Sequence, residues 1–587
     1  MDISTLDRRT LLRGMGAAGG TAALAAWFPA WAQPVSAGIV RPLPTLEGTD
    51  IALRVGHHMM MIDGRKSHAI GINGTVPAPL VRLKEGTKVR LSVTNDLDED
   101  TSIHWHGLLV PFEMDGVPGV SFPGIKPHTT FTYEFELQQS GTYWYHSHSG
   151  LQEQMGHYGP IVIDPAGVDP IQSDREHVIV LSDYSYLHPH TLYRKLKQQG
   201  GYFNYQKQTL AGLLAGRDQT LKERIEWGAM RMDPTDLSDV TGSIYSYLIN
   251  GHGPADNWTG LFTAGERVRL RFVNAAAMTT FNVRIPGLKL TVVATDGLNV
   301  RPVPVDEFQI GVAETYDVIV EPEDRAYTLV AETSDRSGMG RATLAPRAGM
   351  AAEVPPLRKR AVLTMKDMGM GDMDHGASGA GDAGCTPEHA AMGHCTLGGE
   401  MNHSMRDFNV APNVKKTPTV QMISPMPMDR TAEPALGLED VKHKVLVYRD
   451  LMAVERNPDV RAPGREMQIH LTGNMERYMW AFDGEKLSEV KDAIPFVKDE
   501  RVRVTLVNDT MMAHPIHLHG HFFELVTGHG EYAPRKHTIQ VAPGGKMTFD
   551  VTMDAEGDWA FHCHLLYHMH AGMMQVVTVR PSEGEGA

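Results

Sequence analysis

Four His-x-His pairs lie in apolar, strand-like stretches of the 587-residue sequence. They are His104/His106, His146/His148, His517/His519 and His562/His564. Successive side chains of a β-strand point to opposite faces, so the two imidazoles of each pair share one face. Imidazole is a ligand for copper and for zinc. The four pairs therefore predict a metal cluster built on strands.

The spacing of the pairs divides the chain into related units. His104 and His106 lie nine and eleven residues after Asn95, and His517 and His519 lie nine and eleven residues after Asn508. The other two pairs close the same two units. In a middle unit the matching positions hold Val283, Ile285, Val330 and Glu332. Eight histidines from two homologous units predict a cluster at the interface between those units, and the middle unit is predicted to bind no metal.

A second kind of site is indicated by residues 561–574, which read FHCHLLYHMHAGMM. Cys563 alternates with His562 and His564, so it faces away from them and is predicted to serve a different metal. Its candidate partners are His514, His568 and Met573. Two histidines, one cysteine and a weak axial methionine form a blue-copper electron-transfer site. For the eight histidines zinc is the weaker alternative, because structural zinc sites favour four compact ligands rather than eight spread over two domains.

The elements that must position these residues are short strands. Residues 86–95, 265–274 and 499–508 align without gaps and alternate apolar with polar residues, which is typical of half-buried strands. Turn residues separate the strands, and helical periodicity is almost absent. The sequence therefore predicts an all-β chain of three β-sandwich domains, at residues 45–166, 175–345 and 431–581, the second of them without copper ligands.

The N-terminus and the charge narrow the possible partners. Arg8 and Arg9 precede a weakly apolar run and a small-residue end at residues 30–32, which predicts a removed twin-arginine signal peptide over residues 1–32 and a periplasmic location. No other run is long and apolar enough to span a membrane. The formal net charge of −15 argues against a nucleic-acid partner.

Residues 346–430 are rich in Met, His and Gly and are predicted to form a coreless loop and linker. The part from Met365 to Met405 is a candidate route for Cu(I), because thioethers prefer that ion. Cys385 and Cys395 lie within it, and either a disulfide or a pair of Cu(I) ligands fits them.

The motifs HWHG, HSH, HPIHLHGH and HCHLLYHMHAGM together resemble those of the multicopper oxidases. The methionine-rich segment and the twin-arginine signal resemble the copper-resistance protein A family more closely. The resemblance covers nearly the whole mature chain and implies three cupredoxin-like Greek-key domains with about four copper ions.

The resemblance also implies a role for each candidate residue. A type 1 site would use His514, Cys563, His568 and Met573, and a type 2 site would use His104 and His517. A type 3 pair would be held by His106, His146, His148, His519, His562 and His564. Asp115 matches a carboxylate that supplies protons to reduced oxygen. Relatives often carry an acid directly after the residue matching His568, whereas this chain has Met569, which leaves the second proton donor open.

The implied activity is one-electron oxidation of a substrate coupled to four-electron reduction of O2 to water. The soft-ligand segment favours Cu(I) as substrate and a role in copper resistance. A laccase-like oxidase of phenols or other small organic reductants and a copper-sequestering binding protein are the alternatives. A periplasmic copper-delivery protein is a further candidate partner, and the oligomeric state is left open.

Overall fold

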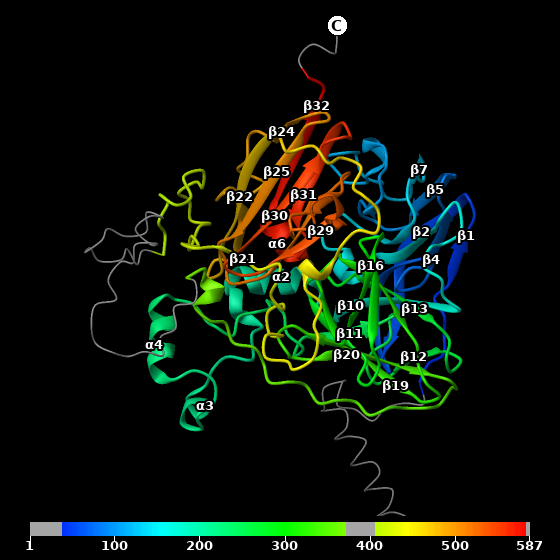
Figure 1. Cartoon of the computed structure of the whole chain (residues 1–587), viewed down its shortest axis with the longest axis horizontal. Helices are drawn as coiled ribbons and strands as arrows, with labels where there is room; N and C mark the ends of the chain where they lie inside the picture. Colours follow the sequence, from blue (N-terminus) through cyan, green and yellow to red (C-terminus); the bar gives the residue numbers. More distant parts are fainter. Residues whose placement is uncertain (1–37, 371–404, 583–587) are drawn as a thin grey trace, which may run out of the picture.

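The computed structural model describes residues 38–370 and 405–582, and strands dominate this part of the chain. Six sheets form three β-sandwiches in sequence order. Figure 1 shows the first in blue, the second in green and the third in orange to red, grouped around a common centre. The prediction of an all-β fold with three sandwich domains is confirmed.

Domain 1 pairs a four-stranded sheet, β3-β2-β5-β7, with a five-stranded sheet, β1-β4-β9-β8-β6. Its strands are β1 (Thr45–Glu47), β2 (Asp50–Ile62), β3 (Arg65–Ile72), β4 (Leu80–Lys84), β5 (Lys88–Asn95), β6 (His104–His106), β7 (Thr130–Glu136), β8 (Gly141–His146) and β9 (Tyr158–Asp164).

Domain 2 pairs sheets of order β11-β10-β13-β18-β15-β16 and β12-β20-β19-β14-β17. Its strands are β10 (Arg175–Ser185), β11 (Tyr245–Ile249), β12 (Trp258–Leu261), β13 (Val268–Asn274), β14 (Phe281–Arg284), β15 (Leu290–Thr295), β16 (Leu298–Val305), β17 (Glu307–Ile310), β18 (Thr315–Val320), β19 (Tyr327–Thr333) and β20 (Met339–Ala345).

Domain 3 pairs sheets of order β23-β22-β25-β30-β27-β28, with β21 beside β30, and β24-β32-β31-β26-β29. Its strands are β21 (Met428–Asp429), β22 (Arg465–Asn474), β23 (Met479–Phe482), β24 (Ile494–Val497), β25 (Arg501–Asn508), β26 (His514–Leu518), β27 (Phe523–Leu525), β28 (Arg535–Lys536), β29 (Thr538–Val541), β30 (Gly545–Thr552), β31 (Gly557–Cys563) and β32 (Met574–Arg580). The short helix α6 (Leu566–Ala571) follows β31.

The three repeated segments form the equivalent strands β5, β13 and β25. Each pairs in parallel with the first long strand of its domain and antiparallel with a later one. The asparagine that ends each segment is buried, and its side-chain amide donates to two carbonyl oxygens of its own domain. These bonds tie the strand to the chain that follows it, which explains why Asn95, Asn274 and Asn508 recur at the same position.

The register in domain 2 corrects the sequence alignment by one residue. His517 pairs with His562 across β26 and β31, and the equivalent Val283 pairs with Ala331 across β14 and β19. Ala331 therefore takes the position that the sequence comparison gave to Val330. Glu332 instead lies in a buried ion-pair cluster with Arg284 and other arginines. The inference that domain 2 has no histidine at the positions equivalent to the metal ligands is unaffected.

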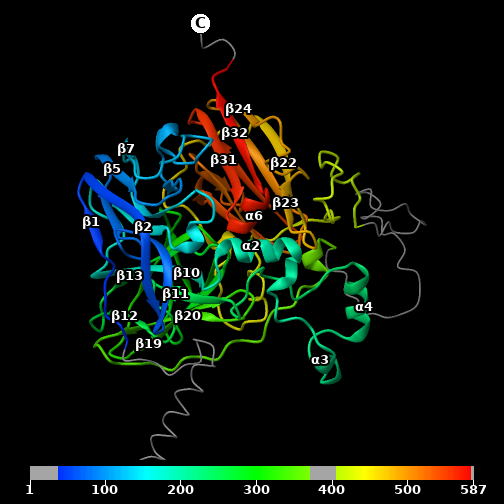
Figure 2. The ribbon, with the colours of Figure 1, turned by 180° about the vertical axis from the view of Figure 1, so that it is seen from behind.

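Two further segments differ from the sequence expectation. Domain 2 contains α2 (Pro189–Gln198), α3 (Leu210–Leu214) and α4 (Leu221–Ala229), and both views place α3 and α4 at the periphery (Figures 1 and 2). A capping box between Thr220 and Glu223 starts α4.

The expectation of a coreless segment over residues 346–430 does not hold for its two flanks, where Leu363, Met368 and Val420 are buried. The cysteines at 385 and 395 lie outside the described residues.

Domain 2 contacts domain 3 through a buried ion-pair cluster. Lys536 lies 3.1 Å from a carboxylate oxygen of Asp296 and 3.1 Å from one of Glu314.

Among the described residues no helix is long and apolar enough to cross a membrane.

Candidate metal centres

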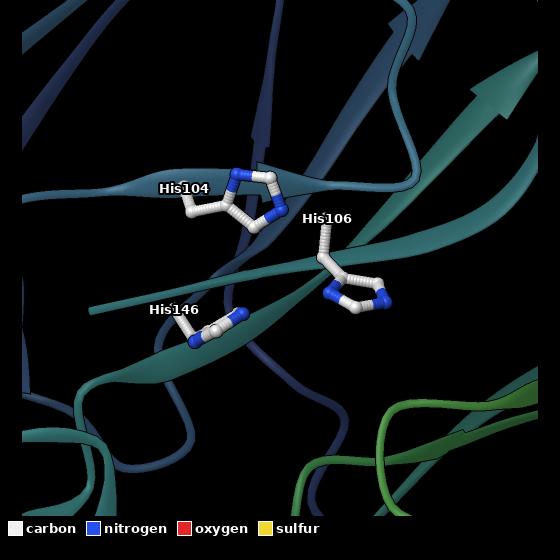
Figure 3. A group of neighbouring side chains, drawn as sticks. All are labelled: His104, His106 and His146. Atoms are coloured by element: carbon white, nitrogen blue, oxygen red, sulfur yellow. The ribbon is translucent and has the colours of Figure 1, made fainter. Parts of the chain in front are cut away.

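The four His-x-His pairs meet between domains 1 and 3. β6 pairs antiparallel with β8, which places His104 opposite His146, and β26 pairs with β31, which places His517 opposite His562. Figure 3 shows the imidazoles of His104, His106 and His146 close together on their two strands. The same local pairing in two homologous domains therefore brings all eight side chains to one interface.

The eight imidazoles include two compact triads, each with members from both domains. In the first triad, His148, His519 and His562 have ring centroids 5.1–5.3 Å apart. The Nε2 atom of His562 lies 3.0 Å from that of His519 and 3.4 Å from that of His148. In the second triad, His106, His146 and His564 have centroids 4.9–5.6 Å apart. Three converging imidazoles are a suitable donor set for one copper ion.

The remaining pair, His104 and His517, has ring centroids 5.8 Å apart. It adjoins both triads, because the ring of His104 lies 3.9 Å from that of His519 and the ring of His517 lies 3.9 Å from that of His106. The eight rings thus form one continuous cluster, in which His104 and His517 are a third candidate donor set beside the two triads.

Five buried ring nitrogens of this cluster have no hydrogen-bond partner within the described part of the chain. They are Nε2 of His104, His146, His517 and His564, and Nδ1 of His106. An unpaired buried nitrogen is costly unless it has a ligand, so these atoms fit a bound metal.

The opposite ring nitrogens are held by oxygen atoms. Nδ1 of His104 donates to the carbonyl of Asp115 at 2.7 Å, and Nδ1 of His517 donates to the carbonyl of His537 at 2.7 Å. Nδ1 of His146 lies 2.8 Å from a carboxylate oxygen of Glu153. Such bonds fix the tautomer and orient a metal-binding ring.

Burial keeps these imidazoles neutral. Burial is the largest cause of the lowered pKa of seven cluster histidines, which are all except His104. Neighbouring imidazoles are a further cause of the lowered pKa. Neutral imidazole is the form that binds metals. The electrostatics of the cluster therefore favour ligand binding over protonation.

Cys563 lies on the other side of β31, with two imidazoles. Its Sγ is 3.5 Å from Nδ1 of His514 and 3.9 Å from Nδ1 of His568, and the two nitrogens are 3.3 Å apart. All three side chains are completely buried, and burial raises the pKa of the thiol. Met573 is also buried, and its carbonyl accepts from the Cys563 amide at 3.1 Å. One cysteine and two histidines at this separation form a compact donor set of two nitrogens and one sulfur.

Two oxygen atoms direct both Nδ1 lone pairs toward Cys563. The Thr510 hydroxyl donates to Asn508 Oδ1 at 2.8 Å, so it accepts from Nε2 of His514 at 2.7 Å. Nε2 of His568 donates to Asp239 Oδ2 at 2.8 Å. Trp480 stacks on the His568 ring with centroids 3.8 Å apart. The repeat asparagine thus also sets the tautomer of a candidate ligand.

Asp115 lies against the histidine cluster, as the sequence led us to expect. Its Oδ2 accepts from Nδ1 of His519 at 2.9 Å, and its Oδ1 is 3.3 Å from Nδ1 of His104. It therefore contacts a ring of the first triad and a ring of the remaining pair.

Three family models for multicopper oxidases match the chain, over residues 54–167, 175–349 and 461–583. The chain is 47% identical to copper resistance protein A of Escherichia coli, over 98% of this chain and 99% of that protein. The chain belongs to the multicopper oxidase family.

Within this family the chain is also 48% identical to a copper resistance protein A homolog of Pseudomonas syringae pv. tomato, over 98% of this chain and 99% of that protein. Among solved structures it is similar in fold to a laccase from Botrytis aclada, with a TM-score of 0.59, 21% identity, and coverage of 94% of this chain and 90% of that one. The predicted membership is confirmed, and the protein is an oxidoreductase with copper-related function.

Several residues around the centres carried no sequence signal. Asp239 and Glu153 lie outside every motif. Asp239 reaches His568 only through long-range packing, across 329 residues, whereas Glu153 follows the HSH motif and contacts His146 locally. Thr538 was missed as well, although its hydroxyl lies 3.1–3.2 Å from ring nitrogens of His106, His517 and His537. Aligning the three domains would not have identified Thr538 either, because only the fold brings the rings of His106, His517 and His537 together around its hydroxyl.

Proposed function

We propose that this protein is a periplasmic multicopper oxidase that oxidises Cu(I) to Cu(II) and reduces O2 to water. The observation that supports Cu(I) as the substrate is one cluster of nine methionines beside the Cys563 centre. Thioether sulfur is a soft ligand that prefers Cu(I). A hydrophobic core ordinarily uses Leu, Ile and Val, and methionine serves as an occasional gap-filler.

The methionine cluster draws on four parts of the chain. Its members are Met230, Met232, Met365, Met368, Met370, Met405, Met422, Met475 and Met511. Six are only partly buried, so the methionine cluster extends to the protein surface. The predicted route from Met365 to Met405 contributes four of them, and its other methionines lie outside the described residues.

The methionine cluster is linked to the Cys563 centre through residues that neighbour its two imidazoles. Met511 directly follows Thr510, whose hydroxyl lies 2.7 Å from Nε2 of His514. Met475 packs against both the methionine cluster and the core that contains Trp480, the residue stacked on His568. These contacts support electron entry through the His514 and His568 rings.

The donor sets fit about four resident copper ions. His514, Cys563 and His568, with Met573 as a weak further ligand, would hold one, and His104 with His517 would hold another. The triads of His106, His146 and His564 and of His148, His519 and His562 would hold a pair. When bound, these ions supply one-electron redox chemistry and activation of O2.

The chain itself would connect the two kinds of site and manage protons. Cys563 directly follows His562 and directly precedes His564, and these two histidines belong to different triads. The backbone therefore connects the thiol of one site to a ring of each triad. Asp115 orients His104 and His519 and is the candidate proton donor. Export by the twin-arginine route is proposed from residues 1–32, which lie outside the described residues.

Oxygen uptake by the copper-loaded protein tests the proposal. Cu(I) is expected to drive uptake at lower concentration than a phenol does. Leucine at Met230, Met365, Met405 and Met475 is expected to reduce Cu(I) oxidation several-fold and to leave phenol oxidation unchanged. Met547→Leu with Met553→Leu, two buried methionines of the domain 3 core outside the methionine cluster, is the matched control.

The other outcomes identify the alternatives. Uptake with phenols but not with Cu(I) would indicate a laccase-like enzyme. Tight binding of Cu(I) without oxygen uptake would indicate a copper-sequestering protein. An equal loss of both activities in the leucine variant, but not in the control, would assign the methionine cluster a structural role.

A further inference from the structure

The hairpin of β2 and β3 carries an exposed group of histidine and methionine side chains away from the candidate centres. Up to Val55 the odd-numbered side chains of β2 are buried, but beyond Gly56 the burial alternation inverts. Met60 and Ile62 then face inward and pack with Tyr184 and Leu248 of domain 2. Figure 2 shows β2 extending from domain 1 alongside domain 2. The opposite face of the hairpin is thereby left open to solvent.

That open face gathers potential copper donors. His57, Met59 and Met61 alternate along β2, so their side chains share one face. Met59 lies directly opposite His68 of β3 in the antiparallel register, which adds a second imidazole to the same face. The side chains of Met59 and Met61 are 58% and 50% exposed, which gives their thioethers no role in a core.

The two imidazoles lie about as close together as the rings of the candidate centres. The ring centroids of His57 and His68 are 4.8 Å apart. The centroids within the two candidate triads are 4.9–5.6 Å apart, and those of His514 and His568 are 5.1 Å apart. Partial burial, the larger cause, and proximity to His57 lower the pKa of His68, which favours the neutral form that binds metals.

We propose that His57, Met59 and His68 form a solvent-exposed copper site on the β2–β3 hairpin, in addition to the four resident ions. The imidazole pair is a donor set for Cu(II), and the Met59 thioether extends it to Cu(I). The proposal does not depend on the identity of the oxidase substrate.

The probe is Cu(II) added to crystals of the copper-loaded full-length protein, with diffraction measured at the copper absorption edge. We expect an anomalous peak between the His57 and His68 rings, and its loss in the His57→Ala/His68→Ala variant. In solution, titration of the copper-loaded protein with Cu(II) should count about one ion fewer in that variant. His128→Ala is the control, since His128 is an exposed histidine of domain 1 paired with Asp98 at 3.2 Å.

Ag(I), a stand-in for Cu(I), tests the thioether. Met59→Leu is expected to weaken Ag(I) binding at the hairpin about ten-fold while leaving Cu(II) binding intact. Unchanged phenol oxidation in every variant would show that the fold and the resident centres are preserved. The proposal is overturned if no anomalous peak appears on the hairpin, or if the double variant and the His128→Ala control bind the same number of Cu(II) ions.

Discussion

The Asp239 carboxylate of domain 2 lies 2.8 Å from Nε2 of His568 in domain 3, across 329 residues of sequence. The same oxygen accepts from the Tyr478 hydroxyl at 2.7 Å. The middle domain, which lacks the histidine pairs, therefore supplies a carboxyl group that contacts a candidate ligand of the Cys563 centre. It also supplies Asp296, which accepts from the backbone amides of His537 and Thr538 beside the histidine cluster.

Replacing Asp239 tests its effect on the Cys563 centre. Burial raises the pKa of Asp239 to about 7, so the carboxylate is mostly ionised above that pH. There, Asp239→Asn can keep the hydrogen bond to His568 but loses the negative charge, so Cu(II) is disfavoured relative to Cu(I). We expect a higher reduction potential, measured by redox titration of the visible absorption band. Asp239→Ala should add a change in the band itself, because His568 loses an interaction worth about 1.5–3 kcal/mol. A potential equal to that of the unaltered protein in both variants would contradict this role.

Cys563→Ser removes the only thiol from the compact donor set that His514 and His568 complete. The intense blue absorption and oxidase activity with any reductant are expected to vanish, since a hydroxyl does not replace a thiolate as a copper ligand. Near-ultraviolet circular dichroism should show that the fold persists, because the two side chains differ little in volume. An intense blue band in this variant would overturn the assignment of Cys563.

The hydroxyl of Thr538 is expected to determine which nitrogen His106 presents. It lies 3.2 Å from Nε2 of His106, and Nδ1 of that ring is the nitrogen without a partner. Thr538→Val keeps the shape and removes the hydroxyl, so we expect a changed near-ultraviolet band of the copper pair and a loss of metal affinity of about ten-fold. Thr538→Ser should restore both. Equal behaviour of the valine and serine variants would refute a positioning role.

Metal analysis of the mature protein, after removal of loosely bound ions, should give about four copper ions per chain. His104→Ala combined with His517→Ala should lower the count by about one, because the two triads and the Cys563 set remain. Tight copper binding mapped to domain 2 would contradict the inference from Val283 and Ala331, which replace the histidines there.

The sequence by itself determined the donor chemistry and the faces on which it lies. A strand repeats every two residues, so HWHG and HCH already specify that paired histidines share a face and that Cys563 opposes its neighbours. The repeat spacing from Asn95 and Asn508 also predicted which two domains meet at the cluster. These are local rules, and they need no knowledge of long-range packing.

Only the tertiary structure decided which rings form a triad and which groups hold them. His148 joins His519 and His562, and His106 joins His146 and His564, because domains 1 and 3 meet in one particular orientation. Asp239 and Thr538 reach their histidines through contacts between domains or between distant strands. Such contacts depend on the packing of whole sheets, which no local periodicity encodes. The same reason explains why methionines from four separate segments form one cluster although the sequence indicated only one of them.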